Sequence, residues 1–489
     1  MPESPAGMRV LAIGSLLAPL CVQRAPAPRC GARRVHTVAE FDELLAQGVP
    51  LSDLDVRGDT AMPDGRSFAD HEVGKLLLAR KARGYTPGLR DDGQHLSLAI
   101  EGGGMRGCVG AGAVSALMDL ELVDCFDSVY GASAGALVGA GLVSRQEGMP
   151  RIGCSIYYDM LTGRGRFFLD KPMLPRTVGL GLLSLPWCGV RELLTDPLGR
   201  PVLNLRYLLD EVLSISSRQL DWASFNASET RLPLHVVASG LESRGPRVLS
   251  RAAGHFSTRE ELLECLRASM LLPGIAGPPV TLPGVDEPLN DAQLFEPIPF
   301  KSAIAGGASH VLVVRTRPDG IKVSRTQGPF EINMYRRFFK RKTSYPQVYD
   351  FLKGGKHKEA YCRDILALNE YTARGVRRPG SWLGDGGEVG EPVGKPSAPH
   401  VFSLALPAGS PTTGQLERRR SEIFAGVRRG FAAAFDVIEG GRRGADAARR
   451  VFPDEILDHP SDPALPEPWP DEQPVHLDGC DRRRSCKVI

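Results

Sequence analysis

The chain has 489 residues, of which 42% are hydrophobic, so it is long enough to bury a sizeable core. Its 60 Lys and Arg nearly balance its 57 Asp and Glu, which argues against nucleic acid and against an acidic substrate as the main partner. The ten cysteines show no C-x-x-C spacing, which indicates neither a zinc site nor a disulfide scaffold, and no apolar run reaches the roughly 18 residues of a membrane span.

The first 36 residues differ in composition from the rest of the chain. Five arginines and a single acid, Glu3, surround an apolar stretch from Val10 to Val22. This pattern is typical either of a targeting segment, organellar or secretory, or of a plain leader rich in Ala and Pro. Residues 37–95 are predicted to form an N-terminal helical extension that begins with a capping box, Thr37 to Glu40.

Two short apolar runs are each followed by a glycine motif. Leu96–Ile100 leads into Gly-Gly-Gly-Met-Arg-Gly at residues 102–107, and Val129-Tyr130 leads into Gly-Ala-Ser-Ala-Gly at residues 131–135. A small-residue helix is predicted after each motif. Ser133 thus falls where a strand becomes a helix, which is the place of an esterase nucleophile, and Gly131 and Gly135 would be the small neighbours of this nucleophile elbow.

The first glycine motif is predicted to supply an oxyanion hole, because backbone amides of a glycine loop can converge on one negative charge. Arg106 would fix this loop by hydrogen bonding or face an anionic part of the substrate. The candidate oxyanion-hole residues are Gly102, Gly103, Gly104, Arg106 and Gly107.

The same glycines also satisfy the dinucleotide fingerprint G-x-G-x-x-G, with Asp127 about 20 residues further on. In a dinucleotide fold that acid lies at the carboxyl end of the second strand, whereas Asp127 precedes Val129 at the start of one. This alternative also leaves Ser133 unexplained, so the esterase interpretation is favoured.

A serine esterase with a triad would place a histidine near the end of its sheet. None of the ten histidines follows a predicted strand, and His310 comes before the strand Val311–Val314. The sequence therefore calls for another base.

Five blocks together, residues 101–107, 131–135, 267–273, 277–280 and 289–300, resemble the successive blocks of patatin-like phospholipases. The last block ends in Pro-Ile-Pro, as in the bacterial-type branch. The resemblance implies an α/β fold, a three-layer α/β/α sandwich with a central, mostly parallel sheet. It also implies a Ser-Asp dyad in which Ser133 is the nucleophile and Asp291 the base, with no metal and no cofactor.

The implied activity is a serine carboxylic-ester hydrolase that cleaves acyl esters of lipids, as a phospholipase A does. The alternatives are a triacylglycerol lipase or transacylase, and a catalytically silent lipid-binding protein. The family usually has Gly-Gly or Gly-Ala after its aspartate, whereas this chain has Ala292-Gln293. If that position requires a positive φ, Ala292 would carry a strain of about 1–2 kcal/mol.

Two further segments have features of lipid contact. Residues 173–187 are apolar and rich in Gly, Leu and Pro, as expected of an acyl-chain entrance or lid, or of an ordinary core segment. Residues 335–342 interleave three aromatic with five basic residues, which suits a membrane surface or an exposed helix with two core phenylalanines. The expected partners are a lipid substrate and a membrane surface, and no nucleic acid.

The catalytic domain is predicted to span residues 96–375. It would be followed by a Gly/Pro linker over 376–400, by a strand and a helix that close the core over 401–440, and by a disordered tail over 441–489. The chain ends in Cys486-Lys487-Val488-Ile489, which fits a prenylation box, and Cys480 would be a second acylation site. Such lipidation conflicts with organellar import directed by residues 1–36. The sequence therefore leaves two locations open: a peripheral membrane or cytoplasmic one, and an organelle.

Overall fold

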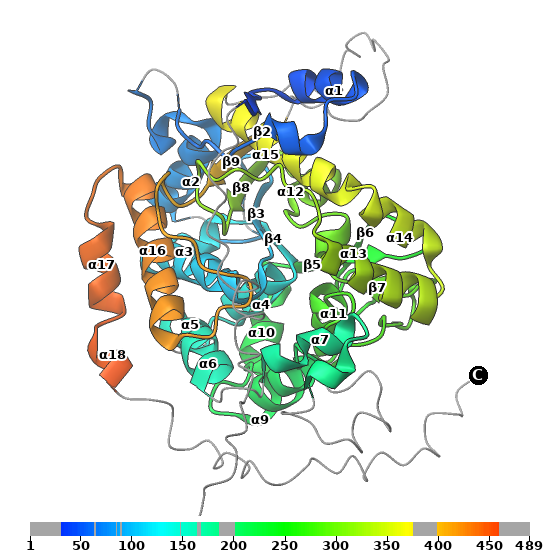
Figure 1. Cartoon of the computed structure of the whole chain (residues 1–489). Coiled ribbons are helices and arrows are strands. Elements are labelled where there is room, and N and C mark those ends of the chain that lie inside the picture. The colour runs from blue at the N-terminus through cyan, green and yellow to red at the C-terminus, as the bar shows by residue number, and fades with distance from the viewer. Residues whose placement is uncertain are drawn as a thin grey trace, which may run out of the picture.

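The computed structural model describes residues 31–62, 65–84, 86–88, 90–146, 148–163, 168–184, 201–374 and 399–458 (Figure 1). The expected leader lies outside the described residues except for its last six positions. Nearly all of the expected linker, the lipidation sites Cys480 and Cys486, and residues 185–187 of the apolar segment also lie outside them.

A seven-stranded sheet forms the centre of the molecule, with the strand order β6-β5-β4-β3-β8-β9 and with β7 paired to β5. Its strands are β3 (Leu96–Ile100), β4 (Ser128–Ala132), β5 (Leu234–Gly240), β6 (Pro246–Leu249), β7 (Leu289–Asn290), β8 (His310–Val314) and β9 (His400–Leu404). Strands β5, β4, β3, β8 and β9 run parallel, whereas β6 and β7 are antiparallel to β5. The predicted α/β class with a mostly parallel sheet is confirmed.

Helices cover both faces of this sheet, because side chains that alternate along each strand point to opposite sides. Leu98 and Ile100 of β3 pack into one apolar core together with α2, α3, α4, α11 and α16. Ala99, between them, packs into a second core with α1, α12 and α15. Both layers are visible in Figure 1, and the three-layer arrangement is therefore confirmed.

The first of these cores is covered by α2 (Glu72–Arg83), α3 (Gly107–Asp119), α4 (Ala134–Ser144), α5 (Met149–Ser155), α10 (Trp222–Glu229), α11 (Arg259–Met270), α16 (Arg420–Glu439) and α17 (Gly444–Val451). The second is covered by α1 (Val38–Ala46), α12 (Phe300–Ala305) and α15 (Lys356–Arg374). The other α-helices within the described residues are α6 (Leu161–Gly163), α7 (Leu174–Thr177), α9 (Leu213–Ile215), α13 (Pro329–Tyr335), α14 (Pro346–Lys353) and α18 (Glu455–Asp458).

The N-terminal extension adds α1, α2 and a small parallel pair of strands, β1 (Arg33–Arg34) and β2 (Leu54–Asp55). Only half of the predicted capping box forms at α1. The Thr37 hydroxyl accepts a hydrogen bond from the Glu40 amide, but the Glu40 carboxylate accepts from His36 rather than from Thr37.

Helix α2 is tied to the amino ends of the strands by a buried arginine. Arg80 donates to Asp92 at 2.8 Å and to Asp127 at 2.7 Å, and Asp127 also accepts from the Leu96 amide. Asp127 therefore has a structural role at the start of β4, at the opposite end of the strand from the position a ribose-binding acid would take.

The C-terminal part returns to the same core. Strand β9 pairs with β8, and α16 packs along α3 (Figure 1). The structure continues past residue 441 as α17 and α18, where the sequence suggested a disordered tail. Ala447, Ala448 and Phe452 are buried against α16 and the main core, and this contact orders a stretch whose polar composition resembled a tail. Residues 459–489 of the expected tail lie outside the described part of the chain.

Candidate active site

Ser133 lies on the sharp turn between β4 and α4, with φ 53° and ψ −122°, so it has the unusual backbone conformation that its motif predicted. The flanking glycines are required by close approach. A Cβ atom at Gly135 would lie 2.2 Å from the carbonyl oxygen of Ile100, and one at Gly131 would lie 2.4 Å from the Cα of Ala136. The helix that begins at Ala134 directs its positive end toward the serine.

Asp291 follows the short strand β7 and faces this turn. The Ser133 hydroxyl donates a hydrogen bond to Asp291 Oδ2 at 3.0 Å, and Asp291 Oδ1 accepts from the Gln293 amide at 2.8 Å. The carboxylate is fully buried. Burial raises the pKa of Asp291 to about 7, against the opposing effect of these two hydrogen bonds, which favour the ionised form.

The backbone after Asp291 shows no strain at Ala292. A 3-10 turn covers Ala292–Leu294, and Asp291 caps it through the hydrogen bond from Gln293. Ala292 is absent from the described non-glycine residues that have a positive φ. The expected strain depended on a positive φ at this position, so the replacement of glycine by alanine does not displace the aspartate.

The glycine loop after β3 lies beside Ser133, because β3 and β4 are neighbours in parallel register with Ile100 opposite Gly131. Not all of its amides are available to a ligand. Gly102 N–H donates to the carbonyl of Pro297, and Arg106 N–H donates to that of Gly103. The Gly107 amide bonds within its own turn. Among the described residues, no hydrogen-bond acceptor is recorded for the amides of Gly103 and Gly104.

Arg106 contributes to the support of this loop. Its Nε donates to the Thr316 hydroxyl at 3.2 Å, and the Thr316 amide donates in turn to Glu101 Oε2 at 2.5 Å. The other oxygen of Glu101 accepts from the Tyr361 hydroxyl at 2.6 Å. Glu101 and Thr316 thus connect the loop to β8 and α15, a role that sequence reasoning missed because the partners lie more than 200 residues apart.

Ser269 is a second residue whose contribution the sequence did not reveal. Ser133 N–H donates to Ser269 Oγ at 2.7 Å, and the Ser269 hydroxyl donates to the carbonyl of Val237 at 2.5 Å. The side chain therefore links the nucleophile turn to β5. Ser269 belongs to a motif block that the sequence had singled out, but nothing in the pattern indicated which atom it would hold.

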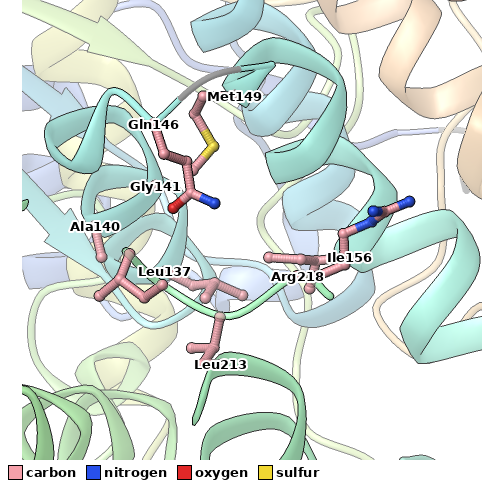
Figure 2. A pocket seen from close by; sticks show the side chains of 9 residues that line it. Leu137, Ala140, Gly141, Gln146, Met149, Ile156, Leu213 and Arg218 are labelled. Carbon is pink, nitrogen blue, oxygen red and sulfur yellow. The ribbon is translucent and has the colours of Figure 1, made fainter. Parts of the chain in front are cut away.

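A small apolar pocket of about 30 Å³ opens beside Ser133. Its lining residues are Gly104, Met105, Ser133, Ala134, Leu137, Tyr157, Leu161, Phe168, Leu203, Leu205, Leu208, Met270 and Leu272. A second pocket, of about 10 Å³, lies further along α4 and is lined in part by Ala140, Met149 and Leu213 (Figure 2). Leu137 lines both pockets, so the two pockets adjoin at this residue.

No histidine takes the place of a third catalytic group in the described structure around Ser133. His310 begins β8 and stacks on His400 at the start of β9, with ring centroids 4.8 Å apart, so both lie at the amino ends of their strands. The parts of the chain that the structure describes contain no cluster of three or more His, Cys, Asp or Glu side chains arranged to hold a metal ion.

The aromatic residues of the basic segment 335–342 point inward. Tyr335, Phe338 and Phe339 are buried, which agrees with the interpretation of an exposed helix with core phenylalanines and not with aromatic insertion into a membrane. No described helix combines the length and the hydropathy that crossing a bilayer requires.

Residues 98–304 match the model of the patatin-like phospholipase family. No curated protein matches the chain in sequence. Among solved structures, VipD from Legionella pneumophila is 12% identical, with a TM-score of 0.30 over 71% of this chain and 67% of VipD. Human GIVD cytosolic phospholipase A2, solved with methyl gamma-linolenyl fluorophosphonate, is 15% identical, with a TM-score of 0.31 over 78% of this chain and 63% of its own.

ExoU from Pseudomonas aeruginosa, solved with SpcU, is 13% identical, with a TM-score of 0.21 over 58% of this chain and 53% of ExoU. All three TM-scores are below 0.5, so the assignment rests on the sequence match, which covers β3, the elbow, the Ser269 block and the Asp291 block. Residues 98–304, less than half of the chain, therefore match a patatin-like phospholipase domain.

Proposed function

We propose that this protein hydrolyses acyl ester bonds of lipids through a covalent acyl-Ser133 intermediate, with Asp291 as the general base. The observation that carries the proposal is the 3.0 Å hydrogen bond from the Ser133 hydroxyl to the buried Asp291 carboxylate, at the edge of an apolar pocket. A nucleophile and a base within hydrogen-bond reach are the basic requirement for acyl transfer.

In the first half-reaction Asp291 takes the hydroxyl proton while Ser133 Oγ attacks the ester carbonyl carbon. The carbonyl oxygen becomes an oxyanion, which the amides of Gly103 and Gly104 would bind, since neither has an acceptor among the described residues. The tetrahedral intermediate then collapses, the bond to the alcohol oxygen breaks, and Asp291 returns the proton to the leaving alcohol.

Water completes the cycle. Asp291 removes a proton from a water molecule that attacks the acyl-serine, and the proton passes to Ser133 Oγ as the fatty acid leaves. The net reaction consumes one ester and one water and yields one acid and one alcohol. A lone carboxylate suits this task because burial raises the pKa of Asp291 to about 7, which makes it a stronger base than an exposed aspartate.

The apolar lining of the pocket supports a fatty-acyl chain as the group that is transferred. Leu137, Leu205 and Leu208 are among the side chains that would contact it. Burial of each CH₂ contributes about 0.8 kcal/mol, so each methylene that enters this apolar lining would strengthen binding.

The experiment is fatty-acid release from a phospholipid and from a triacylglycerol, measured by mass spectrometry. We expect Ser133→Ala to lose at least about 10³-fold of the activity and Asp291→Asn about 10²- to 10⁴-fold. Ser115→Ala is the matched control, because Ser115 is also buried but bonds to Ala111 and Pro150, outside the pocket. Wild-type activity in folded Ser133→Ala would disprove the proposal.

A further inference from the structure

Exposed apolar side chains are concentrated in one short segment. Of the four large apolar side chains that are exposed among the described residues, three lie within residues 180–183. Leu180 is 55% exposed, Leu182 71% and Leu183 48%. Isolated exposed leucines are ordinary, but a contiguous group of them indicates contact with something outside the chain. We call Leu180, Leu182 and Leu183 the leucine ridge.

The two residues before the leucine ridge lie against a basic helical segment. Asn333 in α13 donates to the carbonyl of Val178 at 3.3 Å, and a Cβ atom at Gly179 would lie 3.1 Å from Arg337 Nη1. Helix α13 and the π-helical stretch Arg336–Lys342 that continues it therefore contact the residues that directly precede the ridge, on the same side of the molecule as α7 (Figure 1).

This segment carries more basic than acidic side chains. Residues 329–358 contain eight Lys and Arg but only two acids, Glu331 and Asp350, in a chain whose formal net charge is only +3. Within the described structure, no carboxylate forms an ion pair with Arg336, Arg337, Lys340 or Arg341. Burial of the neighbouring aromatic residues fixes this stretch to the core and leaves Arg336, Lys340 and Arg341 exposed.

We propose that the leucine ridge and the basic stretch 336–342 together form a docking surface for a bilayer that contains anionic phospholipid. Leucines that enter the interface gain by apolar burial, and Lys and Arg beside them gain by contact with lipid phosphates. Charge complementarity selects an anionic lipid surface, because the ridge alone would bind a neutral bilayer as well as an anionic one.

Short chain segments connect the docking surface to the pocket beside Ser133. Phe168 lines that pocket and Leu180 follows only twelve residues later. On the other side, Met270 and Leu272 line the pocket, and a Cβ atom at nearby Gly274 would lie 3.0 Å from Met334 of α13. Docking would therefore hold the pocket beside the bilayer, and this part of the inference rests on the proposed lipid hydrolysis.

The test measures vesicle binding by the full chain with Ser133→Ala, so that it does not depend on catalysis. Cosedimentation would compare vesicles of phosphatidylcholine alone with vesicles that contain about one third phosphatidylserine. Each basic residue near an anionic surface strengthens binding about fivefold, so Lys340→Gln with Arg341→Gln is expected to weaken binding to the anionic vesicles about 25-fold. Leu182→Ser with Leu183→Ser is expected to weaken binding to both kinds of vesicle.

Arg449→Gln with Arg450→Gln is the matched control, since it removes the same charge from exposed positions on α17 and is expected to leave binding unchanged. The same pairs of substitutions are also made in the protein that retains Ser133. Hydrolysis of a water-soluble ester by these variants checks that the site is intact. If the anionic vesicles bind equally well with and without the docking substitutions, or do not bind at all, the inference is wrong even where ester hydrolysis persists. If vesicle binding is intact but the protein that retains Ser133 hydrolyses no ester, only the proposed function is contradicted.

Discussion

The Ser133 hydroxyl and the Asp291 carboxylate are joined by a 3.0 Å hydrogen bond, although 157 residues separate them in the sequence. The sheet brings them together. Ser133 follows β4, Asp291 follows β7, and both strands pair with β5. Because neither side chain depends on a loop alone for its position, the pair is held in place before any substrate binds.

The first prediction concerns the pH dependence of catalysis. A general base must be ionised, and burial raises the pKa of Asp291 to about 7. The value of kcat/KM should therefore rise with pH and level off above a midpoint near 7. The measurement is a pH profile with a soluble ester at constant ionic strength. A profile that is flat between pH 5 and pH 9 would show that another group acts as the base.

The same buried carboxylate should cost stability. Its pKa is higher in the folded protein, about 7, than the ordinary value of 3.8, so the folded state binds the proton more tightly than the unfolded state. The stabilisation of the folded state by this tighter proton binding is complete below about pH 4 and is lost as the pH rises through 7. Asp291→Asn removes the charge, and we expect it to stabilise the protein on the order of 2 kcal/mol at pH 8.

Urea unfolding of the two proteins at pH 5 and pH 8 checks this expectation. The buried Glu296 also has a pKa raised by burial to about 7, but it is present in both proteins, so its contribution cancels in the difference. The expectation is contradicted if Asp291→Asn is less stable than wild type at pH 8. In that case the hydrogen bonds of the carboxylate stabilise the fold by more than the burial of its charge destabilises it.

Ser269 is predicted to position the nucleophile. In Ser269→Ala the Ser133 amide and the Val237 carbonyl lose their partner, which should lower stability by about 1–3 kcal/mol. We expect kcat to fall about 10- to 100-fold with little change in KM, because the turn and not the pocket is disturbed. Ser115→Ala should lose similar stability and keep its kcat, and Ser269→Thr, which retains a hydroxyl, should recover part of the activity.

Leu137 is predicted to limit the length of the acyl chain, because it lines both pockets. In Leu137→Phe the larger ring should fill the space where the two pockets adjoin and exclude about two methylene groups of the acyl chain. At about 0.8 kcal/mol per methylene group, this corresponds to roughly a tenfold loss in kcat/KM. The measurement compares p-nitrophenyl butyrate with the palmitate ester. The short ester is the internal control, and an equal loss for both would show that the chain does not run past Leu137.

The central strands and the nucleophile turn could be predicted because their signals are local. Leu96–Ile100 forms β3 with the expected bounds, and glycines frame Ser133 where the turn leaves no room for a Cβ atom. The position of Asp291 came from the family resemblance rather than from spacing, since a contact between residues so far apart in sequence has no local signature.

Other features depend on tertiary contacts that no pattern in the sequence carries. The amide of Gly102 belongs to the predicted oxyanion loop, but the Pro297 carbonyl occupies it. Ala292 replaces a glycine without strain because Asp291 caps a 3-10 turn there. Helix α17 was missed because its small buried face depends on α16. A distant segment decided the local structure at Gly102 and at α17, whereas the side chain of the preceding residue decided it at Ala292.

Covalent labelling by a fluorophosphonate probe tests the central claim most directly, because the probe reacts only with an activated serine. Wild type should form an adduct on Ser133 that is identified by peptide mass spectrometry, while Ser133→Ala forms none and Asp291→Asn reacts at least about 100-fold more slowly. Failure of folded wild type to label, or undiminished labelling in Asp291→Asn, would contradict the account of Ser133 activated by Asp291.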